Sequence, residues 1–144
     1  MDLSKILSIS GQSSLFKLVG HTKSGAIVEF LKENKRFPIY ASHKVSVLSD
    51  ISVYTEEDVV SLEEVFKRIY KKEEGKPTID PKSDNDILKK YFEEVIPEYD
   101  KERVYISDIK KVLTWYNQLQ EVNLLVFDEE KNEENNSEDK EEKK

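Results

Sequence analysis

The residues of this sequence best suited to recognising a ligand are basic and aromatic side chains within its first 55 positions. The members of this set are Lys17, Lys35, Arg36, Tyr40, His43, Lys44 and Tyr54. Aromatic rings stack on unpaired bases and basic side chains contact phosphates, so the interleaving of both types is typical of an RNA-binding surface. Tyr40 and Tyr54 also suit an aromatic groove that binds an extended peptide. The pattern predicts a binding surface and leaves nucleic acid and protein open as ligands.

A structural explanation competes with this one, because Phe16, Phe30 and Phe37 are spaced among the same basic residues. Phenylalanine is usually buried and lysine usually stays in water. In this alternative, which we favour, the phenylalanine rings fill a core while the lysines line turns.

The charge of the chain is unevenly distributed, which bears on the kind of partner. The net charge is −7 over 144 residues. Residues 1–55 carry seven basic and four acidic side chains, a net charge of +3, and residues 128–144 carry four basic and nine acidic ones, a net charge of −5. An acidic total argues against strong non-specific binding to nucleic acid, whereas the basic front permits a local contact.

Residue types needed for catalysis or for metal binding are scarce. The absence of cysteine excludes disulfides, zinc-thiolate sites, iron–sulfur clusters and thiol nucleophiles. Neither His21 nor His43 has a second histidine or a carboxylate three or four residues further on, and no glycine-rich phosphate loop or GxSxG motif is present. Adjacent carboxylates such as Glu63 and Glu64 diverge by about 100° on a helix. We predict no enzymatic activity, no cofactor and no metal ion.

The segment Asp80–Asp86 resembles a calcium-binding loop only superficially. Lys82 occupies the position of the third-residue ligand, no glycine stands at the sixth position, and Tyr91 replaces the bidentate glutamate. Helix capping by Ser83 and Asp86 is the simpler explanation of these polar residues.

No part of the sequence predicts a contact with a membrane. The longest apolar runs are far shorter than the roughly 20 residues that cross a bilayer. No secretory signal is visible at the N-terminus. We expect a soluble cytoplasmic protein without a membrane partner.

The candidate surface residues stand on short predicted strands. Stretches of branched and aromatic residues predict strands at 15–19, 26–31, 36–40 and 51–55. The opening residues predict a helical turn or a short strand, and residues 45–50 a bend with a helical turn. Pro38 indicates an edge or a bulge. Four or five short strands joined by tight turns predict a small, closed or half-open, SH3-like β-barrel over residues 1–55.

The remainder of the chain predicts a helical domain over residues 56–127. Three apolar stripes with helical period run through residues 62–70, 87–96 and 106–119. Ser61, Ser83 and Ser107 are the expected N-terminal caps, although the first helix could also start near Thr55. Trp115 and Tyr116 should lie at or near the junction of the helices. The sequence leaves open whether Trp115 belongs to the core or to an interface.

The end of the chain is apolar and then strongly acidic. The segment Leu124–Phe127 either packs back as a strand or helix end or serves as a docking motif for a partner. Residues 128–144 are of low complexity and too polar to fold alone, so a disordered acidic tail is predicted. The expected fold is therefore α+β: a small SH3-like β-barrel, a three-helix unit and a disordered acidic tail.

Several segments together resemble a known family. These are DLSKILSISG, FKLV, IVEFL, YASHKVSVLSDISVYT and YISDIKKVLTWYN, which follow one another over roughly residues 1–120. They are similar to an uncharacterised Bacteroidota family of small cytoplasmic proteins, a domain of unknown function of the DUF5606 type. The resemblance implies an SH3-like N-terminal domain and a helical C-terminal domain. It implies no catalytic or binding residue.

Two functional hypotheses follow from these observations. The first is a non-enzymatic cytoplasmic adaptor, a module that binds another protein. The alternative is an RNA- or ribosome-associated factor that binds through the basic barrel. The sequence does not indicate an oligomeric state.

Overall fold

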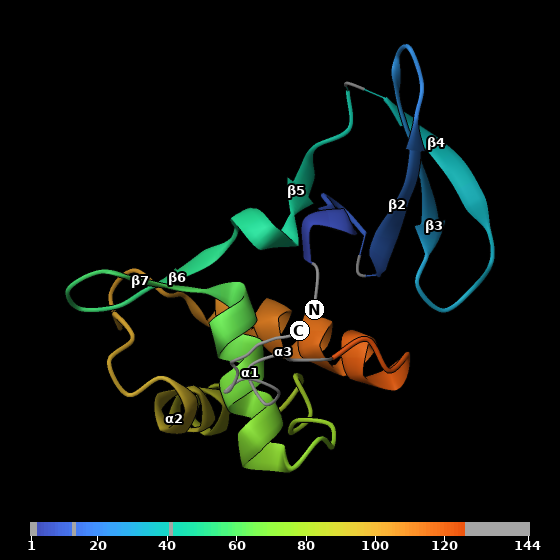
Figure 1. Cartoon of the computed structure of the whole chain (residues 1–144). Coiled ribbons are helices and arrows are strands. Elements are labelled where there is room, and N and C mark those ends of the chain that lie inside the picture. The colour runs from blue at the N-terminus through green and yellow to red at the C-terminus, as the bar shows by residue number, and fades with distance from the viewer. Residues whose placement is uncertain (1–2, 13, 41, 126–144) are drawn as a thin grey trace, which may run out of the picture.

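The computed structural model describes residues 3–12, 14–40 and 42–125 of the chain. The fold is α+β, as predicted, with a five-stranded antiparallel sheet at one end of the molecule and three helices at the other (Figure 1). A two-stranded hairpin lies beside the helices. The predicted acidic tail, residues 128–144, lies outside the described residues.

The sheet confirms the strands predicted at 15–19, 26–31 and 36–40, and it adds a strand at 45–47, where a bend was predicted before the helical turn. Its strands are β1 (Ile6–Ile9), β2 (Leu15–His21), β3 (Gly25–Phe30), β4 (Arg36–Tyr40) and β5 (Val45–Val47), in the order β4-β3-β2-β1-β5. The opening residues form both predicted alternatives, a 3-10 turn η1 (Leu3–Lys5) and then β1. Gly25 allows β3 to approach β4, because a Cβ atom there would lie 1.8 Å from the Ile39 carbonyl oxygen.

The closed form of the predicted barrel is wrong for the described strands. β4 and β5 are the two edges of the sheet and do not pair within the described residues. β5 is only three residues long, because the chain then enters the 3-10 turn η2 (Leu48–Asp50), so it offers little length for pairing. The sheet is therefore open.

The open sheet is nevertheless strongly curved. Its opposite edges are joined by the few residues between Tyr40 and Val45, where the His43 N–H donates to the Tyr40 carbonyl oxygen at 2.9 Å. Five flat strands would set the edges about 19 Å apart. A turn followed by two residues reaches only about 14 Å. The sheet must therefore curl, so that the end of β4 at Tyr40 approaches the start of β5 at Val45.

The inner face of the curved sheet holds a small apolar core. Its buried members are Leu7, Ile9, Phe16, Val28 and Ile39. The rings of Phe16, Phe30 and Phe37 contact one another, with centroids 4.9 to 5.4 Å apart. The expectation that the phenylalanines fill a core is confirmed for Phe16, which is fully buried, and in part for Phe30 and Phe37, which are half-buried against it.

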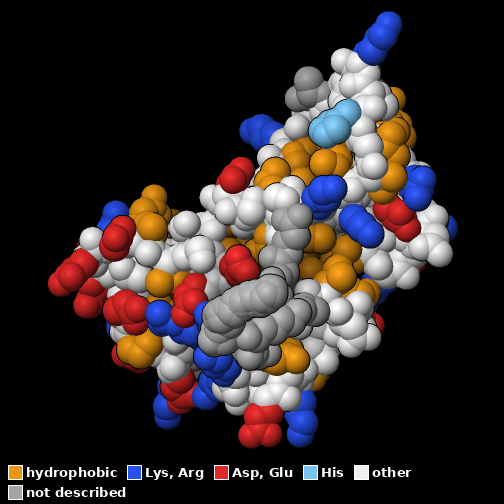
Figure 2. Space-filling model, in the orientation of Figure 1, with side chains coloured by type: hydrophobic (Ala, Val, Ile, Leu, Met, Phe, Trp, Pro, Cys, Tyr) orange, Lys and Arg blue, Asp and Glu red, His pale blue; other side chains and the backbone are white. Residues whose placement is uncertain are grey.

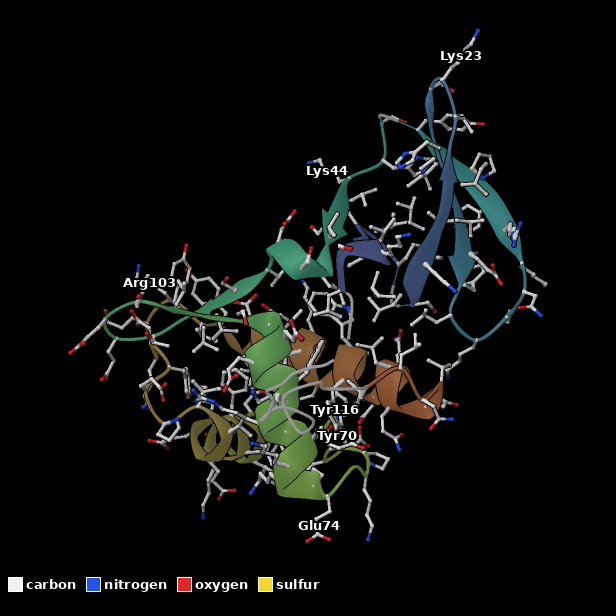
Figure 3. The ribbon with its side chains drawn as sticks, viewed as in Figure 1. Lys23, Lys44, Tyr70, Glu74, Arg103 and Tyr116 are labelled. Carbon is white, nitrogen blue, oxygen red and sulfur yellow. The ribbon has the colours of Figure 1, made fainter. Side chains whose placement is uncertain are left out.

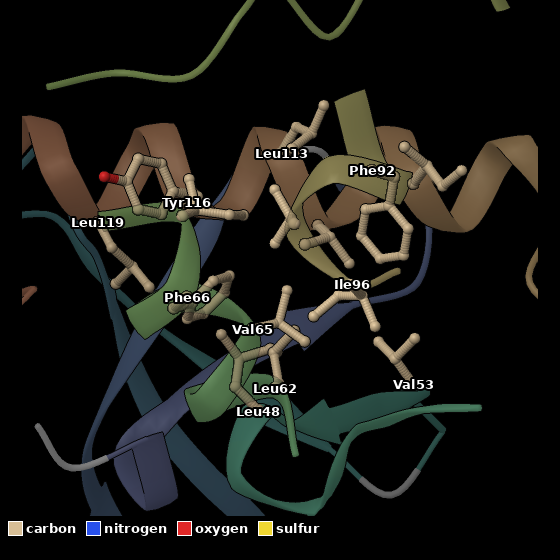
Figure 4. Close-up of a cluster of buried hydrophobic side chains, with 14 of the residues drawn as sticks. Leu48, Val53, Leu62, Val65, Phe66, Phe92, Ile96, Leu113, Tyr116 and Leu119 are labelled. Carbon is tan, nitrogen blue, oxygen red and sulfur yellow. The ribbon is translucent and has the colours of Figure 1, made fainter. Parts of the chain in front are cut away.

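The three helices carry the larger core. They are α1 (Leu62–Glu73), α2 (Asn85–Val95) and α3 (Ile106–Glu121), and each buries most of the apolar stripe predicted from its sequence. Ile87, the first residue of the stripe predicted for α2, is exposed instead. Leu3, Ile6, Leu15 and Leu48 from the N-terminal part join the same core. Figure 4 shows Leu48 beside Leu62 of α1, and Val53 beside Ile96 at the end of α2. The sheet and the helices thus share the larger core, and the small core on the inner face of the sheet is a separate cluster.

A short hairpin connects the sheet to the helices. It pairs β6 (Ser52–Tyr54) with β7 (Val59–Ser61), which was not predicted. The strand predicted at 51–55 is confirmed as β6, but its place in the predicted barrel is wrong, because β6 belongs to this separate two-stranded sheet. Its acidic loop is closed by the Asp58 N–H, which donates to Thr55 Oγ1 at 2.9 Å. β-Branched Val59 and Val60 extend the strand, so α1 begins only after Ser61.

The helix caps test the sequence predictions one by one. Ser61 caps α1 as predicted, because its Oγ accepts from the Glu64 N–H at 3.2 Å. The predicted Ser83 cap is wrong, since α2 begins at Asn85 and the Ser83 hydroxyl donates to the Asp80 carbonyl oxygen. The predicted Ser107 cap is also wrong. α3 begins at Ile106, one residue before Ser107, so the serine lies inside the first turn.

The C-terminal end of the described chain returns to the core. Leu125 is 7% exposed and joins the larger core, whereas Leu124 is 39% exposed. The remaining residues of the predicted apolar segment, 126–127, lie outside the described residues. None of the helices in the described ranges is long and apolar enough to cross a membrane.

Candidate binding cleft

A cleft of about 310 Å³ opens where β5, the β6–β7 hairpin and α3 meet. Its floor is apolar and consists of the buried side chains of Val53, Phe92, Val104 and Val112. Ser46 and Ser52 supply polar groups at its rim. A concave apolar site with a few polar groups is the usual form of a ligand-binding site, and this volume lies at the small end of the range for such sites.

Trp115 lines this cleft from helix α3. It is half-buried and packs against the edge of the larger core, whereas the next residue, Tyr116, is fully buried. Successive residues of a helix point about 100° apart, which turns Trp115 from the core toward the cleft. Tyr116 lies at the junction of the helices, as predicted, because its ring contacts that of Phe66 on α1 with centroids 6.2 Å apart, whereas Trp115 lines the cleft. Trp115 contributes to the edge of the core and to the candidate interface.

Tyr54 and Arg103 form a stacked pair in the cleft. The guanidinium carbon of Arg103 lies 4.4 Å from the centroid of the Tyr54 ring, which is a cation–π contact. Arg103 Nε donates to Asp100 Oδ2 at 2.8 Å. That hydrogen bond is the main reason why the pKa of the Asp100 carboxyl lies below its usual value and that of Arg103 above it. No described residue bonds to the two Nη groups of Arg103.

Asp108 and Lys111 complete the charged rim of the cleft. The carboxylate of Asp108 accepts from the backbone N–H of Tyr105 at 3.0 Å and so caps α3. The ammonium group of Lys111 is exposed and has no ion-pair partner among the residues that the structure describes. The cleft therefore combines apolar, aromatic and hydrogen-bond-donating surfaces.

Among the residues singled out in the sequence for binding, Tyr54 alone lines this cleft. Lys17 and Arg36 lie on the outer face of the sheet in register with Glu29, which accepts from Arg36 Nε at 3.3 Å. Lys35 lies 3.7 Å from a carboxylate oxygen of Glu33. These pairings reduce the positive charge that the outer face offers to a ligand.

Tyr40, His43 and Lys44 are brought together at the turn between β4 and β5. The rings of Tyr40 and His43 stack with centroids 6.1 Å apart. The Tyr40 N–H donates to His43 Nδ1 at 3.0 Å, so His43 closes the turn. Figure 3 places Lys44 beside β5 and Lys23 at the tip of the β2–β3 hairpin, both away from Arg103. The predicted site residues are thus divided among the cleft, the outer face of the sheet and the turn between β4 and β5.

The surface charge also differs between the sheet and the end of the molecule that carries the hairpin. On the face shown in Figure 2, acidic side chains gather at the end that carries the β6–β7 hairpin, and Lys and Arg side chains are spread over the sheet. The loop at residues 56–58, Glu-Glu-Asp, is exposed at the tip of that hairpin.

Within the described part of the chain, no group of three His, Asp or Glu side chains is arranged to hold a metal ion.

Arg103 and Lys111 were not singled out from the sequence as binding residues. Arg103 is 49 residues from Tyr54 along the chain. No short-range sequence pattern connects these two residues. Their segments meet through tertiary contacts, namely the β-bridge between Thr55 and Tyr99 and the hydrogen bond that the Asp100 N–H donates to the Tyr54 carbonyl oxygen. Only the isolated tryptophan signalled that this part of α3 differs from an ordinary core helix.

Comparison with known proteins finds relatives over most of the chain. Residues 3–48 match the family Domain of unknown function (DUF5606), and residues 51–119 match Domain of unknown function (DUF6852). A protein from Bacteroides vulgatus, whose solution NMR structure is known, is 42% identical, with a TM-score of 0.73. The match covers 85% of this chain and 89% of that chain. None of the curated proteins compared matches this chain.

The DUF5606 match confirms the family resemblance seen in the N-terminal segments, and the DUF6852 match contains the helical segment that resembled the same family. The two matched ranges meet between residues 48 and 51, where the chain leaves η2 for the hairpin and lines the cleft with Ile51. The chain belongs to the Bacteroidota family of proteins in which these two domains of unknown function, DUF5606 and DUF6852, follow one another.

Proposed function

We propose that this protein is a non-enzymatic interaction module that binds an extended segment of another protein in the cleft. The observation that supports this proposal is the juxtaposition of the apolar cleft with a sheet edge on which no described strand pairs. Ser46 of β5 lines the cleft, and β5 is an outer strand of the sheet. A free edge offers main-chain hydrogen bonds to a partner strand, and pockets beside it accept the partner's side chains.

The hydrogen-bond pattern of β5 leaves its outer edge ready for such a partner. The Ser10 N–H donates to the Lys44 carbonyl oxygen at 2.9 Å. Bonded and non-bonded pairs alternate along an antiparallel ladder, so the N–H and C=O of Val45 and the N–H of Val47 point away from β1. The Val47 C=O begins the η2 turn. The side chain of Val45 is 36% exposed. A partner strand could therefore extend the sheet next to the cleft.

Aromatic side chains supply the anchors of this site. Tyr54 is 47% exposed and Trp115 is half-buried, so both offer rings to a partner. Tyrosine, tryptophan and arginine carry most of the binding energy in many protein interfaces. The volume of about 310 Å³ accommodates one or two side chains of a peptide and not a folded domain.

A peptide selection tests this proposal. Random linear peptides displayed on phage are selected against the full chain, and a selected peptide is titrated into the isotope-labelled protein. We expect chemical-shift changes at Ser46, Tyr54 and the Trp115 indole. Tyr54→Ala should weaken binding about tenfold. The matched control is Ile87→Ala on α2, a residue that is 52% exposed and does not line the cleft. Selected peptides that shift other surfaces only, or no selected peptide at all, would refute the proposal.

RNA or ribosome binding is a second candidate function, supported by the turn between β4 and β5. Tyr40 is 48% exposed, stacks on His43 and adjoins Lys44, so an aromatic and a basic group face solvent together. Such a pair can stack on a base and contact a phosphate. This candidate predicts RNA binding that falls steeply with salt and is lost in Lys44→Glu. Binding that does not change with salt concentration argues against it.

We also infer that the curved sheet is a half-open barrel of the SH3-like kind. The pairing of its first and last strands, β1 and β5, supports this inference, because closure starts from such a pair. A cysteine-free sequence fits a reducing compartment such as the cytoplasm, where we propose that the protein acts.

A further inference from the structure

We infer that the cleft selects a strand-forming segment of a partner protein that carries a carboxylate side chain two residues from an apolar side chain. This inference rests on the proposed function and specifies the partner of the same cleft. It depends on three observations, which are the free donors at the cleft, the hydrogen bonds that its nearby carboxylates already accept and the spacing of residues along α3.

The free donors of the cleft come from two residues. Arg103 uses Nε on Asp100, which leaves its Nη groups unbonded by any described residue. Lys111 has no ion-pair partner in the described ranges. The stacking of Arg103 on Tyr54 holds the guanidinium in place, so its remaining donors are oriented before a partner binds. A carboxylate is the side chain that satisfies such donors with charge-assisted hydrogen bonds.

The acidic groups near the same donors are already engaged. Asp100 accepts from the Glu102 N–H at 2.9 Å and from the Arg103 N–H at 3.2 Å, in addition to Arg103 Nε. Asp108 accepts from the Tyr105 N–H and lies in the first turn of α3, where the helix dipole favours its charge. The cleft therefore offers more unsatisfied donors than acceptors, which favours an acidic partner over a basic one.

The spacing along α3 matches that of an extended chain. Lys111 and Trp115 are four residues apart on α3, and both line the cleft. Residues at this helical spacing have Cβ atoms about 5–6 Å apart. Side chains at positions i and i+2 of a strand share a face and are about 6.6–6.8 Å apart. One strand can therefore place a carboxylate at Lys111 and an apolar side chain against Trp115.

Phage selection with charge-swapped proteins tests this specificity. The same random peptide library is selected in parallel against the wild-type chain and against Lys111→Glu. The matched control is Lys110→Glu, which makes the same charge change at the neighbouring exposed residue, outside the cleft. Wild type and Lys110→Glu should both enrich Asp or Glu two positions from an aromatic or aliphatic residue. Lys111→Glu should keep the apolar position and lose the acidic preference or replace it with Lys or Arg.

A resynthesised peptide supplies the quantitative test. Replacing its selected glutamate by glutamine should weaken binding to the wild-type chain about tenfold and leave binding to Lys111→Glu unchanged. Peptides that bind the cleft without an acidic preference, or with one that persists in Lys111→Glu, would overturn this inference and leave the proposed function standing. The absence of any cleft-binding peptide would overturn both.

Discussion

Two buried tyrosines link the stability of this fold to alkaline pH. Tyr116 donates its hydroxyl proton to the Lys76 carbonyl oxygen at 3.0 Å, and burial raises its pKa to about 12. The Tyr91 hydroxyl donates to Glu73 Oε2 at 2.5 Å, and burial, followed by this hydrogen bond, raises its pKa further. Tyrosine in an unfolded chain has a pKa of about 10. The folded chain therefore holds these protons where the unfolded chain releases them.

The stability of the protein should consequently fall as the pH rises from about 10 toward 12. Below pH 10 the two tyrosines are protonated in the folded and in the unfolded chain, so the stability is at its full value. Above pH 10 the unfolded chain loses these protons more readily than the folded chain, which favours unfolding. Urea midpoints measured between pH 9 and 12 check this prediction. Tyr116→Phe should make the decline shallower, whereas Tyr105→Phe, at a position that is 65% exposed, serves as the control. A midpoint that stays constant over this range would contradict the assignment.

At the scale of elements, strand β5 decides how a partner can bind. Its outward-facing backbone groups are at Val45 and Val47, because Lys44 and Ser46 pair with β1. Val45→Pro removes an outward N–H, and proline is tolerated on sheet edges where that N–H is not used by the fold. We therefore expect affinity for a cleft-binding peptide to fall about tenfold while stability changes by less than about 1 kcal/mol.

The control for this prediction is Val45→Thr, which keeps the backbone N–H and the β-branched shape. Isothermal titration with the selected peptide gives the affinities, and urea denaturation gives the stabilities. Equal affinities for wild type and Val45→Pro would show that the partner occupies the cleft without extending the sheet.

At the scale of the whole molecule, the shared core predicts a single cooperative unit. Leu15 of β2 is fully buried in the core formed mainly by the helices, and its backbone N–H donates to Gln118 Oε1 of α3 at 2.8 Å. Leu15→Ala leaves a cavity between the two parts and should cost about 2–5 kcal/mol. Helical circular dichroism and Trp115 fluorescence should then report one common, lower midpoint. Two separate midpoints would show that the sheet and the helices unfold independently.

Much of the fold could be predicted from local pattern. The apolar stripe of α3, the strands around Phe16 and Phe30, and the Ser61 cap all depend on residues close together in the chain. The cap predictions failed where competing local bonds exist, as at Ser83, whose hydroxyl donates to Asp80 instead. Whether the barrel closes could not be predicted. Closure requires the two edge strands, β4 and β5, to lie side by side over enough residues to pair, and this depends on the tertiary structure.

The candidate site divides in the same way. Tyr54 was predicted from its residue type alone, and Trp115 was recognised as a position that could be core or interface. The α+β class, the family and the burial of Phe16 could be read from the amino-acid order, because they follow from local periodicity and from runs of residues. The meeting of Tyr54, Arg103 and Lys111 at one cleft could not, because segments some 50 residues apart approach there through the shared core and the Thr55–Tyr99 bridge.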